Sequence, residues 1–165
     1  MIALLAALFL PLFPLSIALN AALMRLRAPV ARGALLLVWP QLGVVLLNTA
    51  QPAVPGFFSA WALASAAFYA LRLLTVRDLG LWAGFSACSA LALTWVLAVA
   101  GADAAELHLF AFWFSLPAAL LALLTGPIAR RLGAAYAGLH GGVVGHLPRL
   151  SGVLIALVLA AIATP

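Results

Sequence analysis

Lysine is absent from this chain of 165 residues, only three residues are acidic, and one is cysteine. Charged residues make up 7% of the sequence, whereas soluble globular domains contain roughly 25%. So few charged side chains cannot cover the surface of a water-soluble fold of this size. The lone cysteine, Cys88, excludes an internal disulfide and a thiolate metal cluster, and we interpret it as a small packing residue.

Apolar residues stand where a soluble protein would carry charge. They make up 68% of the chain, and the mean hydropathy is +1.27, which predicts an integral membrane protein in a lipid bilayer. All eight basic residues are arginine, and the net charge is +5. These arginines are scattered between apolar segments rather than gathered in a stripe, so they do not indicate a nucleic-acid partner.

Apolar runs of about 20 residues predict an all-α integral membrane protein with about six transmembrane helices in a single polytopic domain, residues 1–165. The second run is short and contains Pro40. Pro11 and Pro14 interrupt the first run and Pro117 the fifth, which membrane helices tolerate when neighbours satisfy the freed carbonyls. The predicted spans are Ile2–Met24, Ala34–Ala50, Phe57–Thr75, Leu81–Ala100, His108–Ile128 and Leu150–Thr164.

The charges between these spans alternate from one connection to the next. All eight arginines fall on the first, third and fifth connections or, for Arg72, in the last turn of the span that leads into the third. The second connection has no charge, and the fourth has only Asp103 and Glu106. Cytoplasmic connections carry the excess of arginine in membrane proteins. Both termini are therefore expected on the outer side.

Three segments, in order, resemble the antiporter-like membrane subunits of respiratory complex I, multisubunit cation/proton antiporters and inorganic-carbon uptake complexes. The run from Asp78 to Ser86 is similar to the family pattern Asp-Leu-Lys-Arg-x-x-Ala-Tyr-Ser. Ala118 to Gly126 resembles Lys-Ala-Leu-Leu-Phe-Leu-x-x-Gly. Gly141 to Pro148 resembles Gly-Gly-Leu-x-x-x-Met-Pro and precedes an apolar helix that ends in a proline, as in the family.

The resemblance covers residues 57–165, while residues 1–56 fit only as two generic helices. It implies a truncated, degenerate member of this family, multi-pass in a bacterial inner (cytoplasmic) membrane. Its partners would be larger membrane subunits of an ion-translocating complex and a cytoplasmic module. The family's relay lysines are missing, because Gly80 and Ala118 stand at the matching positions. A chain without buried charge is a poor proton conductor, so we expect a structural or coupling role.

A few residues carry the candidate sites. His108 and Glu106 form a candidate proton-access group near Asp103, because a histidine beside a carboxylate titrates close to neutral pH; a histidine exposed at the interface is the alternative. Asp78 is a candidate coupling residue or a simple helix cap. The fifth connection is the candidate partner-contact loop, with Arg130, Arg131, His140, His146 and Arg149.

The sequence predicts no catalytic residue, no cofactor and no metal site, because His140 and His146 lack further ligands nearby. We interpret the five tryptophans as interfacial anchors or packing residues. Two rows of small residues permit close helix approach within or between subunits. They are Ala60, Ala64 and Ala67, and Gly84, Ala87 and Ser89.

Two other functions stay open at this point. A stand-alone transporter or channel for a small solute would place polar groups or broken helices near the midplane. The candidates for that role are Pro40, Gln41, Asn48, Thr94, Ser115 and Pro117. A membrane enzyme or quinone-site subunit would need a paired acid and base or a ligand cluster. Neither is visible in the sequence, which therefore favours at most a non-catalytic subunit of a redox-driven complex.

Overall fold

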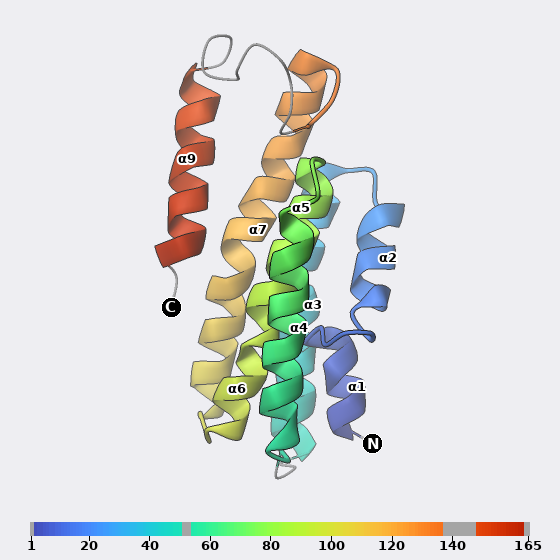
Figure 1. Ribbon diagram of the computed structural model, residues 1–165, viewed down its shortest axis with the longest axis vertical. Helices are drawn as coiled ribbons and strands as arrows, with labels where there is room; N and C mark the ends of the chain where they lie inside the picture. Colours follow the sequence, from blue (N-terminus) through green and yellow to red (C-terminus); the bar gives the residue numbers. More distant parts are fainter. Residues whose placement is uncertain (1, 51–53, 137–147, 164–165) are drawn as a thin grey trace.

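The computed structural model describes residues 2–50, 54–136 and 148–163. Within those ranges the secondary structure is helical, apart from one isolated antiparallel β-bridge between Asp78 and Tyr136. The helices, labelled as in Figure 1, are α1 (Ile2–Phe9), α2 (Ile17–Arg25), α3 (Pro29–Ala50), α4 (Phe57–Leu73), α5 (Leu79–Ala92), α6 (Thr94–Val99), α7 (Ala104–Leu132) and α9 (Pro148–Ala163).

Within the described ranges, three stretches are long and apolar enough to cross a membrane, since a crossing of about 30 Å needs about 20 helical residues. They are Pro29–Thr49 in α3, Leu79–Val99 across α5 and α6, and Ala104–Leu132 in α7. The helices α4 and α9 are also apolar but shorter. The described part of the chain is therefore helical, with helices long and apolar enough for a membrane protein.

The arginines gather at one end of the bundle. The α2–α3 connection, the α4–α5 connection, the end of α7 and the start of α9 lie together at the top of Figure 1, while the α6–α7 connection lies at the opposite end. The segments that carry arginine therefore share one end, and Asp103 and Glu106 lie at the other.

The first expected span consists of two helices, α1 and α2, separated by residues 10–16. Pro11 and Pro14 lie in this break and lack the backbone N–H that would continue the helical pattern. The N–H of Leu12 donates to the carbonyl of Ala7 (3.3 Å) rather than to the residue four before it. Several carbonyls around the break are thereby left without a partner in their own helix.

Three tryptophan indoles from α3, α4 and α6 donate hydrogen bonds to carbonyls at this break. The pairs are Trp39 Nε1 with Leu8 O (3.2 Å), Trp61 Nε1 with Phe13 O (2.6 Å) and Trp95 Nε1 with Leu10 O (3.0 Å). An unpaired carbonyl in hydrocarbon costs several kcal/mol, so these indoles make the break tolerable. The sequence-based interpretation of these tryptophans as anchors or packing residues missed this role.

Polar side chains join α2 to α4 and α5 next to the break. Ser16 forms a short hydrogen bond with the hydroxyl of the buried Tyr69. Asn20 donates to the carbonyl of Ser16 (3.1 Å), and its own side-chain oxygen accepts from Cys88 (3.9 Å). Cys88 is fully buried, as expected of a packing residue. This uncharged network fixes α2 against the bundle.

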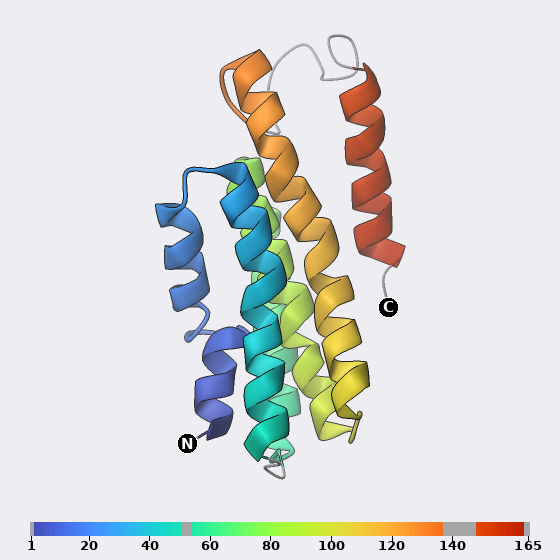
Figure 2. The same ribbon diagram turned by 180° about the vertical axis from the view of Figure 1, so that it is seen from behind.

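The centre of the bundle is the packing of α3 against α7, which lie together in both views (Figures 1 and 2). A Cβ added to Gly33 would lie 3.1 Å from the carbonyl oxygen of Ala119 on α7. One added to Gly43 would lie 2.8 Å from Leu10 Cγ at the α1–α2 break. Both glycines permit close approach where a larger residue would separate the helices.

Several expected boundaries need correction. α3 begins at Pro29, five residues before the predicted start, because Pro29 suits the first turn of a helix. α7 extends beyond both ends of the predicted span and passes through Pro117 without a break. Conversely, the predicted fourth span is interrupted at Leu93, between α5 and α6.

We expect Trp95→Phe to lower the free energy of unfolding by about 1–3 kcal/mol, because the Leu10 carbonyl would lose its donor at a fully buried position. The phenyl ring keeps the stacking on Phe58, whose centroid lies 4.7 Å from the indole. Unfolding in mild detergent measures the change. Trp113→Phe, at a position 43% exposed, is the control and should stay within about 0.5 kcal/mol. Equal losses in both variants would contradict the assigned hydrogen-bonding role.

Candidate functional site: an arginine-lined cavity

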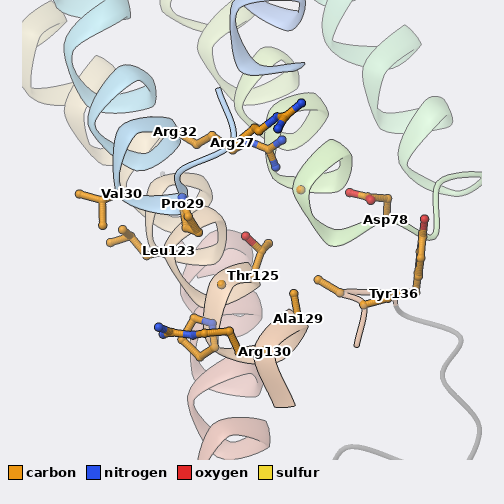
Figure 3. Close-up of a pocket in the computed structure, with 15 residues that line it drawn as sticks. Arg27, Pro29, Val30, Arg32, Asp78, Leu123, Thr125, Ala129, Arg130 and Tyr136 are labelled. Carbon is orange, nitrogen blue, oxygen red and sulfur yellow. The ribbon is translucent and has the colours of Figure 1, made fainter. Parts of the chain in front are cut away.

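A cavity of about 680 Å³ lies at the arginine-bearing end of the bundle. It is open on one side and lies between the start of α3, the start of α5 and the last turns of α7, as Figure 3 shows. Its charged lining residues are Arg27, Arg32, Arg130 and Asp78, so three positive charges face one negative charge. This surplus of positive charge makes the cavity the most chemically distinctive place in the described chain.

Arg32 and Asp78 meet at the backbone of Gly80. A Cβ on Gly80 would lie 2.8 Å from Arg32 Nη1 and 3.1 Å from Asp78 Oδ1. Glycine at this position therefore leaves room for a guanidinium that comes from α3. Arg32 is held in place by its Nε, which donates to the carbonyl of Leu26 (2.6 Å).

Asp78 caps α5. Its side chain accepts a hydrogen bond from the N–H of Leu81 (2.9 Å), which satisfies one of the free amides of the first turn. The N–H of Leu79 donates to the carbonyl of Ala135 (2.9 Å), beside the β-bridge from Asp78 to Tyr136. The segment after α7 is thus bonded to the start of α5, and the two segments together form one side of the cavity.

The expected partner-contact loop is divided by the structure. Arg130 lines the cavity, whereas Arg131 and Arg149 line a separate hollow of about 470 Å³ between α7 and α9. His140 and His146 lie outside the described residues. The loop arginines therefore lie on two sides of α7.

The expected cluster of His108 with Glu106 and Asp103 does not form. Asp103 and Glu106 make a capping box at the start of α7, in which Asp103 N donates to Glu106 Oε2 (3.1 Å) and Glu106 N to Asp103 Oδ1 (2.8 Å). His108 instead pairs through Nδ1 with Gln41 Oε1 of α3 (2.7 Å). The two carboxylates thus bond to backbone amides of the first turn, whereas the imidazole bonds to a side chain of another helix.

The polar residues considered for a transporter have separate roles. Gln41 is paired with His108, and its Nε2 donates to the His108 carbonyl (3.4 Å). Ser115 donates to the carbonyl of Ala111 within its own helix (2.6 Å). Thr94 is fully buried, and its Oγ1 has no hydrogen-bond partner among the residues that the structure describes. Within residues 2–50, 54–136 and 148–163, no group of three or more His, Cys, Asp or Glu is arranged to hold a metal ion.

Sequence reasoning missed the cavity, although it singled out Asp78 and Arg130. The cavity depends on Arg32 and Gly80, which lie far apart in the sequence and meet only because α3 packs beside α5. The available signal was local: an arginine at the start of one span, and a glycine where the family resemblance implies a lysine.

The role of Asp78 can be tested by two substitutions. Asp78→Ala should lower the free energy of unfolding by about 1 kcal/mol through loss of the cap, whereas Asp78→Asn should change it by only a few tenths, since asparagine caps equally well. Unfolding in detergent measures both. If Asn were as damaging as Ala, the carboxylate charge rather than capping would be the required property.

Comparison with protein-family models, with curated proteins and with solved structures finds no match to this chain. Function is therefore inferred from its residues and their geometry.

Proposed function

We propose that this chain is a small multi-pass subunit of an ion-translocating membrane complex, with a structural or coupling role. Its partners would be larger membrane subunits, together with a cytoplasmic module on the arginine-bearing side. The support for the assembly is the sequence resemblance to antiporter-like subunits. The support for a non-conducting role is the uncharged interior of the bundle.

That interior is the observation on which the proposal depends. Among the described residues, the buried polar side chains carry no charge. They are the hydroxyls of Ser16, Ser65, Tyr69, Thr94, Ser115, Thr125 and Ser151 and the thiol of Cys88. The arginines and the three acids are half-buried or exposed, at the two ends of the bundle. Proton transfer across a bilayer needs titratable groups or water along the path. The buried residues that the structure describes supply no chain of such groups.

The proposed topology follows from the same ends. We count α1 with α2 as one crossing and α5 with α6 as another, which together with α3, α4, α7 and α9 makes six. The arginine-bearing end then faces the cytoplasm and both termini lie outside. A bacterial inner membrane is the location implied by the resemblance.

One face of α4 offers a contact for a partner helix. Ala60, Ala64 and Ala67 lie three and four residues apart, on one side of the helix, and all three are exposed. By contrast, Gly84 and Ala87 of the other small-residue row are buried within the chain. Rows of small residues allow helices to pack closely in membranes, so this outward row is the proposed site of subunit contact.

Purification through a tag on this chain in mild detergent should bring down larger membrane subunits. Ala64→Phe should reduce their yield at least about fivefold, because a phenyl ring on α4 would keep a partner helix too far away for close packing. Ala156→Phe, an exposed alanine on α9, is the matched control and should retain them. A monomer that purifies alone and is stable would count against the assembly, and equal losses in both variants against the α4 contact.

The purified chain alone, reconstituted in liposomes, should dissipate an imposed pH gradient no faster than empty liposomes, because its buried polar side chains are uncharged. A pH-sensitive dye inside the liposomes measures the rate. Proton flux that increases with the protein-to-lipid ratio would overturn the non-conducting role.

A stand-alone solute transporter is the second candidate, and the interrupted helices favour it. Broken helices mark substrate sites in many transporters, and here α1–α2 and α5–α6 are both interrupted. The buried Thr94 hydroxyl is at the second interruption, and no described residue forms a hydrogen bond with it. Against this function, the carbonyls of Leu8, Leu10 and Phe13 already accept from indoles. Solute flux by the lone chain, abolished by Thr94→Val, would favour the transporter.

A further inference from the structure

The cavity at the arginine-bearing end contains more positive charge than its own residues neutralise. Arg27, Arg32 and Arg130 line it with a single carboxylate, that of Asp78. In the view of Figure 3 the guanidinium groups of Arg27 and Arg32 lie toward Asp78, and that of Arg130 lies on the opposite side. The three cations therefore surround the space from more than one direction.

Among the described residues, these arginines make few hydrogen bonds. Arg32 donates through Nε to Leu26 O, and its Nη1 lies against the backbone of Gly80. No carboxylate within the described ranges lies within 4 Å of a guanidinium of Arg27, Arg32 or Arg130. The Asp78 carboxylate already accepts from Leu81 N. Arginine forks match the oxygens of a phosphate group, to which they donate in pairs.

The position of the cavity indicates which phosphate it meets. It lies where the last turns of α7 leave the bundle, at the end that carries the arginines (Figure 1). Apolar side chains of Val30 and Leu123 line it beside the arginines. Basic pockets between membrane helices on the cytoplasmic side suit anionic lipid headgroups, and a volume of about 680 Å³ is in the range of small-molecule sites.

We propose that this cavity binds a phosphate ester anion, and that its source is the headgroup of an anionic phospholipid in the surrounding leaflet. The arginines hold the phosphate, and the apolar wall between α3 and α7 faces the glycerol and the upper acyl chain. A bound lipid would link α3, α5 and α7 at this end. This inference does not depend on the proposed assembly.

Native mass spectrometry of the full chain in mild detergent tests the proposal. Phosphatidylglycerol should bind at least about fivefold more tightly than phosphatidylcholine with the same acyl chains, as expected for one net charge at a basic surface. Arg27→Gln and Arg130→Gln, both exposed arginines that line the cavity, should each weaken phosphatidylglycerol binding by about the same factor. A melting temperature unchanged from wild type shows that each variant is folded.

Arg77→Gln is the matched control, since Arg77 lies at the same end and lines neither the cavity nor the hollow beside α9. Its phosphatidylglycerol affinity should stay within about twofold of wild type. Equal loss in Arg77→Gln would show a diffuse surface charge effect and overturn the site. Retained affinity in Arg27→Gln and Arg130→Gln would overturn it as well.

A second binding experiment, with inorganic phosphate and glycerol 3-phosphate, distinguishes a lipid headgroup from a soluble phosphate as the ligand. Weak binding of both, together with the lipid preference, supports the headgroup. The opposite result is that the chain binds the soluble anions, that the cavity variants lose this binding, and that phosphatidylglycerol is not preferred over phosphatidylcholine. This result overturns the lipid source and assigns a soluble phosphate. No preference among any of these ligands overturns the anion site altogether.

Discussion

The hydrogen bonds from three indoles to the interrupted first span are the interactions on which the rest of this bundle depends. In hydrocarbon, every peptide group must find its partner inside the protein, and two prolines prevent residues 10–16 from doing so within one helix. Trp39, Trp61 and Trp95 supply the missing donors from three other helices. The break therefore becomes the point at which α3, α4 and α6 are joined to the N-terminal helices.

This junction also positions the charged end. Because α1 and α2 are separate, α2 can pack against α4 and α5 through Ser16 and Asn20, and its last residues lead directly to Arg27 and the start of α3. The turn into α3 brings Arg32 against Gly80 of α5. The cavity thus forms because the first span is divided into α1 and α2 and because α2 is bonded to α4 and α5. Its charge stays at one end of the bundle, while the buried side chains that the structure describes make only uncharged hydrogen bonds.

The sequence was sufficient for the features that depend on composition and local pattern. The scarcity of charge predicted membrane helices. The distribution of arginine over alternate connections predicted that the arginine-bearing connections lie at the same end of the bundle. The cap at Asp78 was one of the two roles expected for that residue, and the structure shows it. These features need only neighbouring residues or simple counting.

The features that failed depend on contacts between distant residues. Nothing near Trp95 in the sequence indicates that its indole reaches Leu10. The interruption at Leu93 contains neither proline nor glycine, so no local signal marks it. His108 was assigned to its sequence neighbours, but Gln41 on another helix is its partner, because the capping box already engages the carboxylates. Tertiary packing overrode the local interpretation in each case.

The central claim of the proposed topology is that the arginine-bearing segments, which share one end of the bundle, also share one side of the membrane, opposite the start of α7. Single cysteines at Arg77, Arg131 and Ala105, in a Cys88→Ser background, can be labelled with a membrane-impermeant maleimide in bacterial cells. The cysteine at position 105 should react in intact cells, and those at 77 and 131 only after the membrane is permeabilised. Reaction of positions 77 and 131 from opposite sides would contradict this account.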